Sequence, residues 1–275
     1  MSLAESHPGG ASDSWNGSEY RENTAHHRAF DPPALWDLRL GPGDSLLDVG
    51  CGGGDLTAAL ADHNPEVEVV GIDASPSQID QARQRLHPRL RFEVKRVQEL
   101  EWERKFAAAY SIACFHWIPH EEHPSVLEKI FSALIPGGRL IASFAAQENI
   151  ADIREIIFSV AVQSPFHEFV RGRPPHHPWP SLRQYREMVN RSSFGGAEEL
   201  WTEVQPRPFT HPRLLGWLRT QTLTGYRPLL PPEVFEDLVH TVGEQVADLT
   251  RTGPDRHVVP FVRLQLQARR PKTCT

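Results

Sequence analysis

The residues with the clearest capacity for chemistry are an acid and a run of glycines in the segment Asp48-Val49-Gly50-Cys51-Gly52-Gly53-Gly54. An apolar run that ends in glycines and continues into a helix offers backbone N–H groups to a ligand, because no side chain stands in the way. A second acid, Asp73, closes the next apolar run, 25 residues after Asp48. A carboxylate in that place can accept hydrogen bonds from both hydroxyls of a ribose. The pattern indicates a cofactor that contains a nucleoside.

The glycine spacing separates two kinds of cofactor. A dinucleotide motif G-x-G-x-x-G beginning at Gly50 requires glycine at position 55, where this chain has Asp55. The observed D-x-G-x-G-x-G instead resembles motif I of the class I S-adenosylmethionine (SAM) methyltransferases, whose loop accommodates a methionine tail. The resemblance implies SAM as cofactor, S-adenosylhomocysteine (SAH) as product, and these cofactor-binding residues: Asp48, Gly50, Cys51, Gly52, Gly54, Asp73, Ala74, Val97 and Cys114. A glycine-rich turn without a ligand is the alternative.

The resemblance covers most of the chain. The segments 15–20 (WNGSEY), 115–120 (FHWIPH) and 134–140 (LIPGGRL) are similar to motifs of the trans-aconitate methyltransferase group, as are 224–228 and 260–263. The 115–120 segment corresponds to a substrate-facing turn of that group. Two positions depart from the pattern: Arg96 stands where the family has an acid that accepts the adenine amino group, and Ala107 replaces an acid at the start of the fourth strand. We therefore expect adenine to be held by backbone groups near Val97 and by apolar packing.

The acceptor decides which groups a methyltransferase needs. A sulfonium is an excellent leaving group, so the protein mainly aligns the reactants and excludes water. A carboxylate acceptor needs only a cation or hydrogen-bond donors, whereas a phenol or amine benefits from a base, and a methylated alkene becomes a carbocation that aromatic faces stabilise. The predicted catalytic residues are Tyr20, which would orient the substrate or close the pocket, and His116, a base or a donor. An ordinary buried tyrosine and a packed histidine are the alternatives.

Aromatic residues and arginines are interspersed in the second half of the chain. The predicted substrate-binding residues are Tyr20, His116, Trp117, Phe158, Phe169, Trp179, Phe209 and Trp217, and nearby arginines include Arg154, Arg171, Arg173, Arg183 and Arg186. Any one of these aromatics is more often core, and any one arginine more often solvated. Together they favour an apolar natural-product acceptor with one anionic anchor, as in C-methyltransferases that alkylate a prenyl group of a teleocidin-type indole alkaloid. The alternatives are a carboxylate O-methyltransferase of the trans-aconitate type and a non-catalytic SAM-binding protein.

The histidines suggest a metal site only superficially. His116, His120 and His123 are close in sequence, but Pro119 and Pro124 interrupt any regular helical face. Adjacent histidines, at 26–27 and 176–177, point in different directions and rarely share an ion. No metal is expected.

Hydrophobic periodicity predicts the elements that position these residues. Strands are expected at 45–49, 67–72, 90–94, 107–114 and 139–144, and an antiparallel pair at 198–204 and 257–268. Helices are expected at 32–40, 56–63, 76–86, 125–134, 150–162, 182–189, 214–218 and 232–249. This alternation predicts an α/β fold: a Rossmann-like, doubly wound, mostly parallel seven-stranded sheet with a helical cap.

Composition bounds the remaining possibilities. The 275 residues are expected to divide into N-terminal cap or lid helices (1–40), a SAM-binding α/β core (41–149), a helical substrate cap with the penultimate strand and helix of the core (150–256), and a last strand and tail (257–275). A net charge of −6 argues against a nucleic-acid partner. Three cysteines, no apolar run long enough for a membrane and no leader pattern predict a cytoplasmic protein. A homo-oligomer that exchanges its N-terminal helix is expected, and the arginine-rich, lysine-poor composition suggests the secondary metabolism of an actinomycete.

Overall fold

The computed structural model describes residues 32–85, 87–175 and 178–272. Within them the sheet has the strand order β3-β2-β1-β4-β5-β8-β6, and the short β7 pairs with β8. The first five strands of that order, β3 to β5, are parallel to one another. Strand β8 is antiparallel to both β5 and β6. The strands are β1 Ser45–Val49, β2 Glu68–Asp73, β3 Leu90–Val94, β4 Phe106–Ile112, β5 Leu134–Ala145, β6 Glu199–Phe209, β7 Arg251–Gly253 and β8 Arg256–Arg269.

The helices begin at the residues that favour helix starts. Proline stands in the first turn of α4, α5, α9 and α10, where its missing N–H costs nothing. Ser75 and Ser181 cap α4 and α8 by accepting backbone N–H groups. The helices are α2 Pro33–Trp36, α3 Asp55–His63, α4 Pro76–Ala82, α5 His123–Ala133, α6 Ala151–Ala161, α7 His167–Val170, α8 Leu182–Arg191, α9 His211–Trp217 and α10 Pro232–Thr250, with short turns η2 Val97–Glu99, η3 Phe115–Trp117 and η6 Thr224–Tyr226.

Hydrophobic clusters hold these elements together, and the three largest in the described residues lie as follows. One face of the sheet packs against α5 and α8, with Phe144 and Tyr185 fully buried between them. The other face packs against α2 and α3 through residues such as Leu35 and Leu60. A separate core joins α6, α9 and α10 to the ends of β6 and β8. Each fully buried Leu or Phe contributes about 1.5–3 kcal/mol, so these clusters carry much of the stability.

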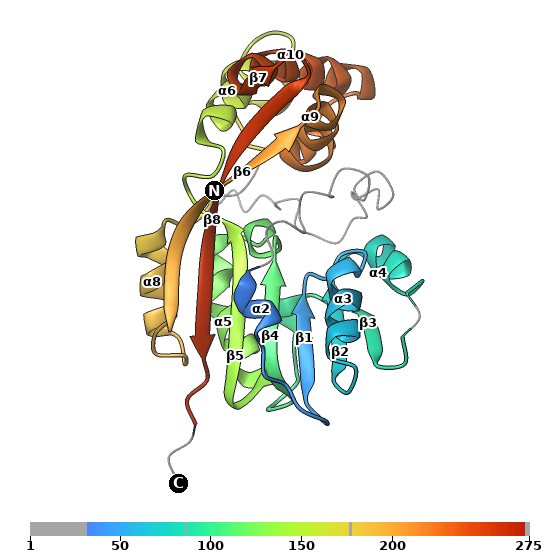
Figure 1. Ribbon diagram of the computed structural model, residues 1–275. Helices are drawn as coiled ribbons and strands as arrows, with labels where there is room; N and C mark the ends of the chain where they lie inside the picture. Colours follow the sequence, from blue (N-terminus) through green and yellow to red (C-terminus); the bar gives the residue numbers. More distant parts are fainter. Residues whose placement is uncertain (1–31, 86, 176–177, 273–275) are drawn as a thin grey trace.

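Two lobes result from this arrangement (Figure 1). The lower lobe contains the sheet with its flanking helices, and the upper lobe contains α6, α9, α10 and β7. The long strands β6 and β8 extend from the lower lobe into the upper one, so the cap is continuous with the sheet. The carboxyl ends of β1, β2, β4 and β5 point toward the cap, which is the edge where an open α/β sheet binds its ligands.

The sheet confirms the predicted fold class, and the antiparallel pair β6–β8 is present as expected. Several boundaries differ from the predictions: β6, for example, continues to Phe209 instead of ending at 204. Helix α2 ends at Trp36 and α4 at Ala82, four residues earlier than expected in each case, whereas β5 begins at Leu134, before the Pro-Gly-Gly turn. Helix α2 also packs on the sheet, so that part of the segment 1–40 is not a lid. The rest of that segment, with Tyr20 and the helix expected to be exchanged, lies outside the described residues. No helix in the described part of the chain has the length and apolarity that a membrane span requires.

Candidate active site

The glycine loop after β1 is bent tightly between its neighbouring strands. The backbone N–H groups of Gly50 and Cys51 both donate to the Ile72 carbonyl of β2, at 2.8 and 2.9 Å. Gly50, Gly52 and Gly54 have φ values of +79°, +51° and +76°, which L side chains rarely adopt. A Cβ on Gly50 would lie 2.4 Å from Cβ and Sγ of Cys114, at the end of β4. The glycine at position 50 is therefore required both by its backbone angle and by the close approach of β4.

Asp73 fixes the same loop from the end of β2. Its Oδ2 accepts the N–H of Gly52 and its Oδ1 accepts the N–H of Ser75, both at 2.9 Å. Burial raises the pKa of the Asp73 carboxyl, and the N–H donors around it lower that pKa and limit the rise. A carboxylate oxygen has a second lone pair, so both oxygens can still accept a ribose hydroxyl. A half-buried carboxylate beside a loop without side chains fits the nucleoside and methionine parts of SAM.

Asp48 connects the end of β1 to the helix α3. Its carboxylate is almost completely buried and accepts the hydroxyl of Thr57 on α3, at 2.6 Å. This hydrogen bond ties the end of β1 to the helix that follows the glycine loop. The structure therefore gives Asp48 the task of holding the loop, and its direct contact with SAM stays a prediction.

Burial disfavours the thiolate form of the two cysteines at the site. Burial raises the pKa of the Cys51 thiol far above its usual range, and burial also raises that of Cys114 to about 12. The nearby carboxylates of Asp48 and Asp73 add to both shifts. Both thiols thus stay protonated at neutral pH and serve as small side chains beside the loop.

The remaining cofactor positions divide by exposure. Ala74 is exposed directly after Asp73, whereas the side chain of Val97 is buried in the core, so only the backbone of Val97 is placed to meet a ligand. The N–H of Arg96 is used by Glu99, at 3.2 Å. Ala107 lies near the amino end of β4, at the other end of the strand from the carboxyl edge.

The turn after β4 carries the predicted substrate-facing residues. It begins with Ala113, whose φ of +59° is left-handed and whose N–H donates to the Ser143 carbonyl of β5 at 2.8 Å. Such a conformation in a non-glycine residue costs about 1–3 kcal/mol and occurs often at functional sites. The turn is closed by His123, whose Nε2 lies 3.1 Å from the Phe115 carbonyl and 3.2 Å from that of Ile118. Because both partners are carbonyls, Nε2 must carry the proton, and burial lowers the pKa of His123 to about 4.

His116 is oriented by β5 and by the segment before α8. Its Nδ1 accepts the N–H of Ala145 at 3.4 Å, and its backbone carbonyl accepts the indole N–H of Trp179 at 3.1 Å. A neutral imidazole that accepts at Nδ1 carries its proton on Nε2. In this tautomer Nε2 is the donor of the ring, and the role of His116 as a base or a donor toward the acceptor stays a prediction.

The predicted aromatic wall is only partly assembled at this point. Trp117 and Trp179 both make ring contacts with His116, with centroids 5.2 and 6.1 Å apart. Phe158 on α6 is 51% exposed, and Phe169 is half-buried against the cap core. Phe209 and Trp217 are buried in that core, with ring centroids 5.7 Å apart, which gives them a packing role; their contact with an acceptor stays a prediction.

Two supports of the site were not predicted individually. Arg263 on β8 is buried and donates from Nη2 to the Ser143 carbonyl, so it secures the strand that also holds Ala113. Gly225 in η6 lies so close to the 171–180 segment that a Cβ would come within 1.9 Å of the Pro175 carbonyl. Both positions belong to motifs shared with the trans-aconitate group, which was the only signal in the sequence.

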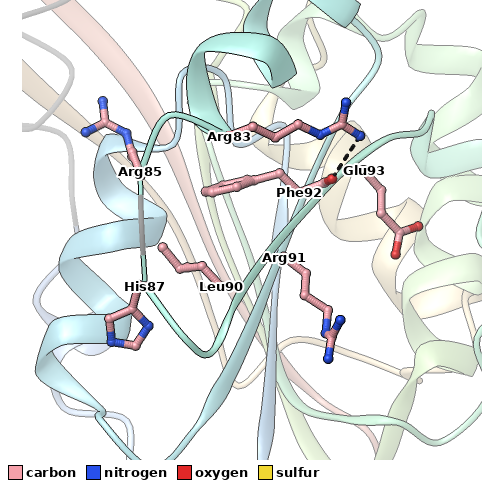
Figure 2. A pocket seen from close by; sticks show the side chains of 7 residues that line it. All are labelled: Arg83, Arg85, His87, Leu90, Arg91, Phe92 and Glu93. Atoms are coloured by element: carbon pink, nitrogen blue, oxygen red, sulfur yellow. Dashed lines mark hydrogen bonds between the residues drawn. The ribbon is translucent and has the colours of Figure 1, made fainter.

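A pocket of about 460 Å³ lies at the opposite edge of the sheet, beside β3 (Figure 2). Its side chains diverge: Arg83 turns back to the Phe92 carbonyl, whereas Arg91 and His87 point away from each other. Arg85 donates to the Gly53 carbonyl at 2.7 Å and pairs with Asp55 at 2.7 Å. This edge thus braces the outer side of the glycine loop. Among residues 32–272, as far as they are described, no three His, Cys, Asp or Glu side chains are grouped to hold a metal.

Comparison with known proteins agrees with this geometry. A family model described as a methyltransferase domain matches residues 46–138, which include the glycine loop, Asp73 and the His116 turn. A trans-aconitate 2-methyltransferase from Methylobacterium nodulans is 26% identical over 265 residues, covering 94% of this chain and 99% of that protein. Another from Deinococcus radiodurans is 34% identical over 142 residues, covering 51% of this chain and 53% of that protein.

Solved structures show the same fold. Phosphoethanolamine N-methyltransferase 2 from Haemonchus contortus, in complex with phosphomonomethylethanolamine and SAH, has a TM-score of 0.51 and 20% identity, covering 92% of this chain and 53% of that one. A mycolic acid cyclopropane synthase in complex with SAH and CTAB has a TM-score of 0.52 and 20% identity, covering 86% of this chain and 81% of that one. The fold, the domain match and the glycine loop with its acid agree that this chain is a class I SAM-dependent methyltransferase.

Proposed function

We propose that this methyltransferase acts on a carboxylate oxygen of a small polycarboxylic acid and forms a methyl ester. The observation that carries the proposal is the hydrogen bond that His116 accepts at Nδ1 from the Ala145 N–H. A neutral ring that accepts at Nδ1 has its proton on Nε2, so it favours a role as donor over a role as base there. A carboxylate acceptor is already ionised at neutral pH and needs donors and cations to position it, whereas a phenol or an amine has a proton to lose.

The curated relatives support the same acceptor class. The trans-aconitate 2-methyltransferase from Methylobacterium nodulans aligns with nearly the whole of this chain, cap included. The segment that supplies His116 and Trp117 belongs to the motifs shared with that group. We therefore favour the carboxylate over the apolar natural product that the aromatic composition suggested.

The residues divide the work between cofactor and acceptor. When bound, SAM supplies an electrophilic methyl group on a sulfonium. Asp73 and the glycine loop would hold its ribose and methionine parts, and the backbone at Val97 would face its adenine. His116 would orient the acceptor carboxylate by donating from Nε2, while Trp117 and Trp179 exclude water.

A second candidate acceptor is an apolar natural product, such as a prenylated indole alkaloid. The observation in its favour is Phe158, a large aromatic side chain that is 51% exposed on α6. An exposed aromatic ring in the cap can contact an apolar acceptor. A methyl-transfer assay that offers both kinds of acceptor can distinguish the two candidates.

The test uses the purified full-length chain, methyl-labelled SAM and a panel of acceptors: trans-aconitate, other di- and tricarboxylates, a phenol and a prenylated indole. We expect label in a base-labile ester of a polycarboxylate, with a rate that is level between about pH 6.5 and 8.5, because no base must lose a proton. We expect His116→Gln, which keeps a donor, to retain more activity than His116→Phe. Transfer to carbon or to a phenol, with all carboxylates inert, would refute the proposal.

A further inference from the structure

Arg154 is a cation in an unusual position for a surface helix. It lies in the first turns of α6, the helix that follows β5 in the chain, and its side chain is half-buried. Its guanidinium donates from Nη1 to the Gln147 carbonyl at 3.1 Å, and its Cζ lies 5.2 Å from the centroid of the Trp179 ring. The guanidinium is therefore held in one orientation over an aromatic face.

The stack connects Arg154 to the acceptor side of the active site. The Trp179 ring under the guanidinium also donates its indole N–H to the His116 carbonyl and packs edge-on against the His116 ring. The N–H of Gln147 donates to the Pro180 carbonyl, so both partners of Arg154 belong to the same junction of β5 and the Trp179 segment. Arg154 and His116 thus both contact Trp179: the guanidinium lies over its ring, and the His116 ring packs edge-on against it.

The charge of Arg154 is not neutralised by a close carboxylate. No acidic side chain of the described residues lies within 4 Å of it, although Glu148 and Glu155 are near enough to favour its charged form. Burial lowers its pKa, the opposite direction to these two glutamates. Other arginines of the described chain, such as Arg85, Arg219 and Arg269, pair with a carboxylate at 2.7 Å or closer. A partly desolvated guanidinium gains most from an anion that arrives with the substrate.

We propose that Arg154 binds a second carboxylate of the acceptor, so that the enzyme selects di- and tricarboxylic acids over monocarboxylic ones. The inference rests on the proposed function and extends it, because it assigns the residue that reads the number of carboxylates. His116 orients one carboxylate, and Arg154 holds another across the Trp179 ring. The planar guanidinium matches a carboxylate bidentately, which a lysine does not.

Direct binding tests the proposal without reference to turnover. Trans-aconitate is titrated calorimetrically into the full-length chain saturated with SAH, for the wild type, Arg154→Gln and Arg154→Lys. The matched control is Arg183→Gln, which removes the same charge from an exposed side chain on α8. We expect Arg154→Gln to weaken binding by about 10-fold to 100-fold, the range for a hydrogen-bonded charged group, and Arg154→Lys to be intermediate. Arg183→Gln should stay within twofold of the wild type.

The acceptor assay separates the failure of this inference from that of the proposed function. We expect Arg154→Gln to raise the KM for trans-aconitate at least tenfold, to change kcat less, and to reduce the preference for polycarboxylates over monocarboxylates. Wild-type esterification that Arg154→Gln leaves within twofold would overturn the role of Arg154 and leave the proposed function intact. Arg154-dependent binding without any esterification would sustain the anchor and refute the proposed function. No saturable binding of trans-aconitate or the other polycarboxylates to the wild type would overturn both.

Discussion

Replacing Asp73 should separate cofactor affinity from folding. In Asp73→Ala the loop loses the acceptor of the Gly52 and Ser75 N–H groups, and the predicted ribose contacts disappear with it. Hydrogen bonds to a charged group contribute about 1.5–3 kcal/mol each and are not additive, so a total loss of about 2–4 kcal/mol is expected. At 1.4 kcal/mol per tenfold, the Kd for SAH should rise about 30-fold to 1000-fold. Asp73→Asn keeps one acceptor oxygen and should lose about 10-fold to 100-fold.

The stability of the ligand-free protein should depend on Asp73 less than the affinity for SAH does. Burial raises the pKa of Asp73 in the folded state, so the folded protein holds this proton more tightly than the unfolded chain does. The contribution to stability is complete below the unfolded pKa and is lost as the pH rises through the folded pKa. At pH 7 the ionised carboxylate is therefore a cost to folding, and Asp73→Asn should leave the Tm of the ligand-free protein within a few degrees of the wild type.

The assay is calorimetric titration of SAH, with thermal unfolding of the ligand-free proteins measured alongside. The control is Asp80→Ala on α4, whose side chain is 75% exposed. SAH affinity of the wild type should also fall at acidic pH as Asp73 takes up its proton, and should do so above the ordinary aspartate pKa. An Asp73→Ala protein that folds and binds SAH within threefold of the wild type would refute the assignment of Asp73 and of the glycine loop.

Three further perturbations test other parts of the site. Gly50→Ala should abolish SAH binding, because its Cβ would lie 2.4 Å from the Cys114 side chain, and adding Cys114→Gly should recover part of that binding, since only the strain at φ +79° remains; calorimetry showing no recovery would contradict the steric reason. His123→Gln should remove a pH dependence of the free energy of unfolding. Because the pKa of His123 falls from about 6.5 to about 4 on folding, the protein has its full stability above pH 6.5 and loses about 3 kcal/mol of it as the pH falls to 4. The free energies of unfolding in urea at pH 7 and pH 4 should therefore differ by about 3 kcal/mol more in the wild type than in the variant. Gly225→Ala should raise the KM for the acceptor about tenfold without changing SAH affinity, because it displaces the segment that holds Trp179. Gly41→Ala, where there is space for a Cβ, should leave that KM unchanged. Equal effects of the two variants would argue against a link between Gly225 and the acceptor site.

Local signals decided which elements could be predicted. Strands β1 and β3 have the predicted bounds, because each apolar run is closed by residues that leave the strand. The early end of α4 depends on Arg85, which turns away to bind Gly53 and Asp55, and this contact spans 32 residues of sequence. The start of β5 depends on the pairing of Leu134 with Phe106 across the sheet. Neither contact leaves a periodic pattern in the sequence.

The residues of the candidate site also divide into those that local sequence signals predict and those that contacts between distant residues determine. The glycines and Asp73 could be predicted because a cofactor loop depends on residue types at short spacing. The protonation of His116 could not, since its partner is a backbone N–H on another strand, 29 residues away. Residue type also fails to distinguish Trp179, which contacts His116, from Trp217, which lies in the cap core. Likewise Arg154 is one of five interspersed arginines in the sequence, and its stack on Trp179 is a contact that the sequence does not reveal.

The carboxyl edge of the sheet is built as two halves that meet where β1 pairs with β4. The β1–β2 half holds the cofactor loop through Ile72 and Asp73, whereas the β4–β5 half holds His116 through Ala145 and Ser143. Beyond that pairing, Ser111 of β4 donates its hydroxyl to the Val49 carbonyl of β1, and Gly50 lies tightly against Cys114. The contacts that hold the cofactor loop and those that orient His116 nevertheless come from different strands, β2 for the loop and β5 for His116. If the proposed function holds, substitutions at Arg154, Trp179 and His116 should change the choice of acceptor and leave the affinity for SAH unchanged.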